Sequence, residues 1–180
     1  MNAADALGVV EAFDASDSGL AQKSRELTTG LLLSTPAPFS RDHFTPGHIT
    51  CTALVLHPTQ PLVLFMHHHR LKRWLLPGGH VETGDVSLPA AAAREALEET
   101  LVRIDASVEP VLAGIDVHGI SPKGSEPYHL HHDLIWCFRA LHADIAVTDE
   151  APEVRWAGES EWDGMGIAES IRYSILRACR

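Results

Sequence analysis

The chain has 180 residues, 45% of them hydrophobic, and this length and composition suit one globular domain with a core of ordinary size. Its formal net charge of -10 excludes a general affinity for nucleic-acid polymers, because phosphate backbones are bound by clustered lysines and arginines. The start of the chain lacks the pattern of a signal peptide and there is no run of about 18 apolar residues, so we expect a cytoplasmic protein without membrane contact.

The first part of the chain predicts a helical preface and a loop. Leu20, Leu27 and Leu31 lie near one face of a helix over 18–34, whereas 34–47 contains three prolines and a glycine that break any regular pattern. We therefore expect an N-terminal helical extension and loop over 1–46, and one domain over 47–180. Residues 1–15 are candidates for disorder, and the N-terminal helix offers a surface for a homodimer contact.

The rest of the chain alternates strands and helices. Branched and apolar runs predict two strands, which the segment His57–Pro58–Thr59–Gln60–Pro61 separates as in a hairpin. The expected strands are 48–57, 61–68, 74–76, 108–118, 128–140 and 153–157, and the expected helices are 88–100 and 167–178. This order indicates an α/β fold with a mixed sheet covered by helices.

The central helix has clear start signals. Ser87 is a plausible N-cap, and Pro89 falls in the first turn, where its missing N–H does no harm. The four alanines at 90–93 then favour helix strongly.

Three glutamates crowd one face of that helix. Glu95, Glu98 and Glu99 stand at i, i+3 and i+4, inside an arc of roughly 100°, so their carboxylates converge on one patch. Like charges this close are unfavourable unless something positive lies between them. Oxygen ligands in this number suit Mg²⁺ or Mn²⁺, which also bridge to substrate phosphates. The helix therefore predicts a divalent-metal site.

Two neighbouring features support this site. The turn at Gly78–Gly79 lets the backbone approach without a side chain in the way, and Gly79 can lend its carbonyl to a metal. Arg94 can pair with a glutamate and orient it.

Residues 79–101 resemble the Nudix box, the signature of the Nudix hydrolases. That pattern is a glycine, five residues, a glutamate, seven residues, Arg-Glu, an apolar residue, any residue, Glu-Glu, any residue and a glycine. Here Gly79 begins it and residues 94–99 (REALEE) supply its core. There are two departures: Asp85 replaces the first glutamate, with eight residues before Arg94, and Leu101 replaces the closing glycine. The extra residue falls in the loop before the helix and leaves the register of the core intact.

The resemblance implies a Nudix fold, an α/β/α sandwich with a mixed β-sheet. It implies a hydrolase that cleaves the phosphoanhydride bond of a nucleoside diphosphate linked to another moiety. The resemblance places the metal at Glu95, Glu98, Glu99 and the Gly79 carbonyl, and it assigns catalysis to Glu95, Glu98 and Arg94. We favour Glu95 as both metal ligand and general base, with Glu150 or Glu153 as a second contributor.

Substrate contacts are expected from two other stretches. Arg70 and Lys72 belong to a small basic cluster in a loop, which can steer a pyrophosphate in this acidic protein. In the strand over 128–136, His129, His131 and Asp133 share one face. They can bind a metal, contact a phosphate oxygen, or form a structural hydrogen-bonded network, and all three interpretations stay open.

Two other functions stay open. A Nudix-fold module can bind a nucleotide without cleaving it. An isoprenyl diphosphate isomerase shares the fold but relies on a catalytic cysteine, whereas Cys51 and Cys137 lie in expected strands without a matching motif. With Cys179 they are three widely spaced cysteines, which suggests neither a disulfide framework nor a zinc knuckle and predicts buried apolar residues.

Overall fold

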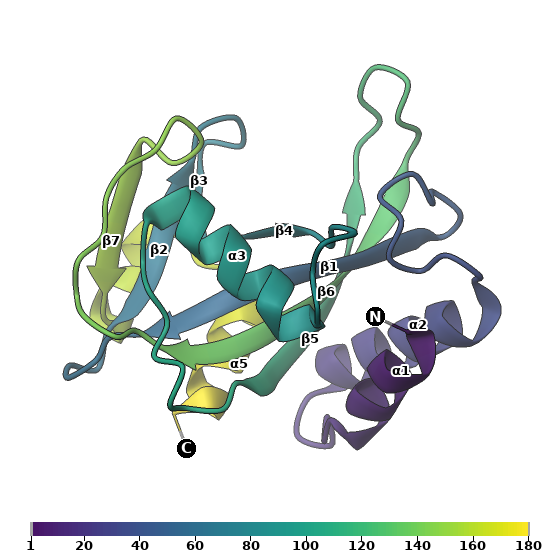
Figure 1. Ribbon diagram of the computed structural model, residues 1–180, viewed down its shortest axis with the longest axis horizontal. Helices are drawn as coiled ribbons and strands as arrows, with labels where there is room; N and C mark the ends of the chain where they lie inside the picture. The colour runs from purple at the N-terminus through teal and green to yellow at the C-terminus, as the bar shows by residue number, and fades with distance from the viewer. Residues whose placement is uncertain (1, 180) are drawn as a thin grey trace.

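A computed structural model describes residues 2–179 and shows a mixed β-sheet flanked by helices (Figure 1). The strands are β1 (Gly47–Leu56), β2 (Val63–His68), β3 (Arg73–Leu75), β4 (Gly78–His80), β5 (Val111–Ile120), β6 (His129–Arg139) and β7 (Glu153–Ala157). The helices are α1 (Ala3–Ala12), α2 (Gly19–Ser34), α3 (Leu88–Thr100), α4 (Trp162–Met165) and α5 (Glu169–Ala178), with a 3₁₀ turn over Glu159–Glu161. Within the described residues, no helix has the length and apolar character to span a bilayer.

The sheet runs in the order β3-β2-β1-β6-β5, with β4 added to β1 and β7 added to β2. Strands β1 and β6 are parallel over their whole length, and the other pairs are antiparallel. The expected hairpin of β1 and β2 forms only at its closed end, where Leu56 pairs with Val63. The long middle of β1 is instead held between β4 and β6.

The two faces of β1 belong to different layers. Ile49, Cys51 and Ala53 are fully buried on the face covered by α3, while Leu54 belongs to a second buried cluster on the face covered by α5. In Figure 1, α3 crosses the front of the sheet and α5 lies behind it. Helix α3 contacts β1, β4 and β6, so its side chains are positioned by the sheet.

The N-terminal extension packs on the domain. Helices α1 and α2 contact each other, and α2 contacts β5, so the core that includes Val10 and Leu31 continues into that of the sheet. The expectation of disorder over 1–15 is therefore wrong for Ala3–Ala12, where Asn2 accepts a hydrogen bond from the Asp5 backbone N–H and caps the helix. Such short capped helices become stable through the tertiary burial of an apolar face.

The cysteines follow the prediction in part. Cys51 and Cys137 are buried, whereas Cys179 is exposed beyond the end of α5, so the expectation of burial is wrong for it. Cys179 is the C-cap residue of α5, one position after Ala178, which still packs against the core.

Candidate active site

Helix α3 is placed by its caps and its alanines. Ser87 Oγ accepts a hydrogen bond from the Ala90 backbone N–H at 3.2 Å, as the sequence predicts. Ala92 and Ala96 are fully buried, so the helix backbone lies close to the sheet. The helix ends at Leu101, whose φ of 55° is left-handed. Leu101 stands where the box has its glycine, so the turn keeps its shape without the residue that favours it.

The glycines of β4 bring backbone against the glutamates of α3. The Gly78 N–H donates to Glu99 Oε2 at 2.8 Å. A Cβ on Gly79 would lie 2.6 Å from Glu95 Oε1, and one on Gly78 would lie 2.5 Å from Thr52 Oγ1. A Cβ on Gly78 would also lie 2.8 Å from the Cys51 carbonyl oxygen and from Thr52 Cα, so only glycine allows the approach of backbone there. At Gly79 the nearest atoms all belong to the carboxylate end of Glu95, which a side chain would displace.

Arg94 organises the carboxylates. Its guanidinium donates to both oxygens of Asp85, from Nε at 3.0 Å and from Nη2 at 3.1 Å. Its Nη1 also donates to Glu95 at 2.9 Å and to Glu98 at 3.0 Å, and its Nη2 donates to the His80 carbonyl at 2.9 Å. The positive group between the Glu95 and Glu98 carboxylates is therefore this side chain.

Asp85 has a defined structural place despite the altered spacing of the box. Hydrogen bonds from Arg94 hold the pKa of Asp85 below its usual value, and those to Asp85 raise the pKa of Arg94. Asp85 also accepts from the Glu82 backbone N–H at 2.8 Å, which closes the loop before α3. The loop absorbs the extra residue, as expected, and Asp85 orients Arg94 from there.

Burial makes the inner glutamates electrostatically unusual. The Glu99 side chain is almost completely buried, and this burial raises its pKa to about 8; the nearby Glu95 and Glu150 charges add to the shift. Burial also raises the pKa of Glu95. Desolvation and like charge both disfavour the ionised carboxylate, and a cation would relieve both. Among the residues considered as a second contributor, Glu150 is thus the one whose charge acts on these carboxylates.

The three glutamates do not form one tight set. Glu98 is largely exposed and held by Arg94, while Glu95 and Glu99 point inward. Within residues 2–179, their carboxylate oxygens do not all come within 4.8 Å of one another. The helical spacing correctly places them on neighbouring turns, but Arg94 keeps Glu98 apart.

The predicted substrate residues fall in different places. Arg70 and Lys72 are exposed in the turn between β2 and β3, and Glu153 is exposed on β7 opposite His67. Across the part of the chain that the structure describes, no ion pair joins these three residues to the glutamates of α3. Their expected roles stay predictions.

The predicted polar residues on one face of β6 have different partners. His129, His131 and Asp133 share a face of β6, but the buried Asp133 accepts from Thr50 at 3.1 Å and Thr52 at 2.7 Å. This network is the structural alternative considered from the sequence, and burial raises the pKa of Asp133 within it.

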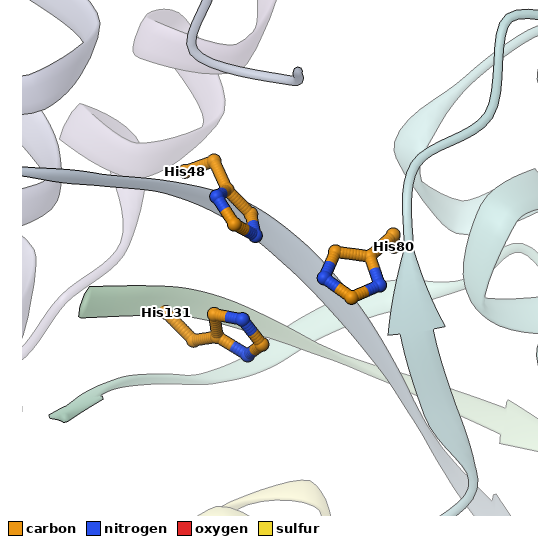
Figure 2. A group of neighbouring side chains, drawn as sticks. All are labelled: His48, His80 and His131. Carbon is orange, nitrogen blue, oxygen red and sulfur yellow. The ribbon is translucent and has the colours of Figure 1, made fainter. Parts of the chain in front are cut away.

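The imidazole of His131 instead meets two histidines that sequence reasoning missed, His48 of β1 and His80 of β4 (Figure 2). The register explains the first meeting, since His48 pairs directly with His131 across the parallel strands. Alternation along His48, Thr50 and Thr52 is the one signal in the sequence that places them on a common face.

Comparison with known proteins gives a family and a fold. The family model of the NUDIX domain matches residues 47–170. The structure resembles the NUDIX domain of Shewanella oneidensis NrtR complexed with ADP ribose, with a TM-score of 0.54 at 18% identity over 73% of this chain and 85% of that one. It also resembles the E. coli dihydroneopterin triphosphate pyrophosphohydrolase, with a TM-score of 0.55 at 20% identity over 72% and 92%.

A third similar structure is a C. elegans Ap4A hydrolase, with a TM-score of 0.50 at 13% identity over 73% of this chain and 94% of that one. The search of curated proteins gives no significant match. Identities this low show the fold alone.

Proposed function

The chain belongs to the NUDIX domain family, and from this premise we propose that it is a Mg²⁺- or Mn²⁺-dependent pyrophosphohydrolase. Its substrate is a nucleoside diphosphate linked to another moiety, and the bond cleaved is the phosphoanhydride. The similar proteins named above act on or bind nucleotide-type or triphosphate compounds, which supports this substrate class without identifying the compound.

The observation that carries the proposal is the buried carboxylate of Glu99. Burial and the charges of Glu95 and Glu150 raise the pKa of Glu99 to about 8. Keeping such a carboxylate ionised lowers the stability of the fold. Perturbed titration of this kind is typical of functional sites. The cost is understandable if the site serves a divalent cation.

The residues present fit such a cation. Glu95, Glu98 and Glu99, with the Gly79 carbonyl, offer the hard oxygen donors that Mg²⁺ and Mn²⁺ prefer. When bound, the ion would lower the pKa of a water and neutralise phosphate charge. Glu98 joins this set by turning away from Arg94.

Within this site, the protein's own groups divide the work. Glu95 lies inward with a raised pKa, so it is suited to take a proton from the attacking water. Arg94 holds Glu95 in place and is itself held by the two hydrogen bonds that it donates to the carboxylate of Asp85. The narrow gap at Gly79 keeps Glu95 against the backbone. Arg70 and Lys72 attract the anionic substrate from the rim.

The test is hydrolysis of a panel of compounds with Mg²⁺ or Mn²⁺, comparing wild type with Glu98→Gln and Glu95→Gln. The panel contains ADP-ribose, NADH, dinucleoside polyphosphates, nucleotide sugars and nucleoside triphosphates. We expect metal-dependent cleavage of one class, and a loss of at least about 100-fold in kcat for Glu95→Gln. Glu159→Gln, at an exposed position outside the carboxylate site, is the matched control.

Three outcomes separate the alternatives. If no compound is cleaved but a nucleotide raises the melting temperature, the protein is a binding module. If an isoprenyl diphosphate, assayed separately from this panel, is rearranged without release of phosphate, it is an isomerase. Equal activity of Glu95→Gln and wild type would refute the catalytic roles assigned here.

A further inference from the structure

Strand β4 presents side chains to both faces of the sheet. Gly79 faces α3 and Glu95, whereas His80, the next residue, faces the opposite side, where it pairs with Thr50 of β1. On that side lie His48 and His131. These histidines are separate from the carboxylates of α3 and take no part in the proposed hydrolysis.

Three imidazole rings converge on this face. The ring centroids are 4.8 Å apart for His48 and His131, 5.1 Å for His48 and His80, and 5.2 Å for His80 and His131. One nitrogen from each ring lies within 4.8 Å of one nitrogen from each of the others. Figure 2 shows the three rings facing a common space from β1, β4 and β6. This is the one group of three or more potential metal ligands at such distances within residues 2–179.

The protonation of His48 is set by its surroundings. Its Nδ1 lies 3.1 Å from the His43 carbonyl oxygen, so Nδ1 carries the proton and donates it. Nε2 is then the unprotonated nitrogen. Within the described residues Nε2 is buried and has no hydrogen-bond partner. A backbone carbonyl that fixes the tautomer while the other nitrogen faces inward is the usual support of a metal-binding histidine.

From this geometry we propose that His48, His80 and His131 form a second metal site, which binds a transition-metal ion of the zinc class. Imidazole nitrogens select such ions, whereas Mg²⁺ prefers oxygen ligands, so this site and the carboxylate site differ in metal preference. Three protein ligands leave at least one coordination position open for water or another ligand.

The charge state of the rings agrees with this role. Burial and the neighbouring histidines lower the pKa of His80 to about 4 and of His131 to about 2, so both rings are neutral at pH 7. Neutral imidazole is the form that ligates metal. A neutral imidazole is a weaker partner for a phosphate than a charged donor is.

Binding requires a small closure. Zn–N bonds of about 2.0–2.1 Å in tetrahedral geometry place ligand nitrogens roughly 3.4 Å apart. The ring nitrogens here are separated by up to 4.8 Å. Rotation of the side chains about χ1 and χ2 would supply this adjustment. Among the described residues, His80 and His131 are held by ring contacts rather than by side-chain hydrogen bonds, so this rotation breaks no hydrogen bond of theirs.

The experiment measures metal binding rather than catalysis. Tag-free full-length protein is stripped with a chelator, and zinc content and affinity are then measured by mass spectrometry and by competition with a chromophoric chelator, in the presence of excess Mg²⁺. Cobalt substitution gives a visible spectrum that reports nitrogen ligation. The variants are His80→Asn and His131→Asn. The controls are His67→Asn, in the partly exposed run at 67–69, and Glu99→Gln, at the carboxylate site.

We expect one equivalent of zinc in wild type and in both controls, and an affinity at least about 100-fold weaker in His80→Asn and in His131→Asn. Circular dichroism shows whether each variant folds. His80 is only half-buried, so its variant remains informative if His131→Asn does not fold. Unchanged zinc binding in the folded variants overturns the site, as does loss of zinc in His67→Asn alone. If metal-free wild type binds inorganic phosphate and His80→Asn does not, the cluster is an anion site, and this result also overturns the proposed metal site.

Discussion

The buried Glu99 predicts an unusual dependence of stability on pH. Its pKa is about 8 in the folded protein against 4.5 for an ordinary glutamate, so the unfolded chain loses this proton first. Stability must then fall as pH rises above 4.5, and the loss is complete only above pH 8. Because one pKa unit corresponds to about 1.4 kcal/mol, the ionised carboxylate costs the metal-free protein about 4 kcal/mol near pH 8.

Glu99→Gln removes this titration while keeping an oxygen that can accept from the Gly78 N–H. In the presence of a chelator, we expect its free energy of unfolding to exceed that of wild type by about 1 kcal/mol at pH 5 and by about 4 kcal/mol at pH 8. The assay is urea denaturation at several pH values. Mg²⁺ at pH 8 should narrow the difference, because a bound cation stabilises only the ionised wild-type carboxylate.

Glu98→Gln is the matched control, since it removes the same charge from an exposed position one residue away. Parallel stability curves for wild type and Glu99→Gln between pH 5 and pH 8 would refute the reasoning. If the difference in free energy of unfolding between wild type and Glu99→Gln rises with pH but Mg²⁺ does not change it, the carboxylate has the raised pKa but does not bind Mg²⁺.

Three further changes test the site. Gly79→Ala forces a Cβ against Glu95 and should lower kcat at least about 100-fold, measured by chromatography of the nucleotide product. Leu101→Gly relieves a left-handed φ at an exposed residue and should raise the free energy of unfolding by about 1 kcal/mol in urea. Asp85→Asn removes one of the four carboxylates paired with Arg94 and should lower kcat about tenfold with little change in KM, as seen in a substrate titration.

Each of these has its own control and contrary result. Gly84→Ala places a Cβ in open space in the loop between β4 and α3, and it should leave activity unchanged. Activity retained in Gly79→Ala would show that the close approach to Glu95 is unimportant. A destabilised Leu101→Gly would mean that the leucine side chain contributes more than its conformation costs. A rise in KM alone in Asp85→Asn would make Arg94 a substrate contact.

Local signals in the sequence were enough to predict the helix and its carboxylates. Ser87, Pro89 and the alanines act within one or two turns, so the bounds of α3 follow from residues close together. The same local reasoning cannot show that Arg94 bonds Asp85, because that contact depends on how the loop between β4 and α3 folds back. It also cannot show that Glu98 turns outward while Glu99 is buried, since burial depends on where β4 lies.

The histidine cluster shows why some sites escape a reading of the sequence. Strand alternation correctly places His129 and His131 on one face. Their actual neighbour, His48, is joined to them by a parallel pairing of β1 and β6, strands that are far apart along the chain. No periodicity records a parallel pairing, because its connection runs through a helix and several other strands.

His80 links the two candidate sites physically. Its imidazole faces His48 and His131, while its backbone carbonyl accepts the Arg94 Nη2 at 2.9 Å. A metal ion held by the imidazole would therefore restrain the carbonyl that helps to position Arg94. Because His80 belongs to the same short strand as Gly78 and Gly79, loading the histidine site with zinc should also stiffen the Gly78–Gly79 segment. Slower amide hydrogen exchange at the Gly79 and His80 N–H groups on addition of zinc, lost in His131→Asn, would reveal this coupling.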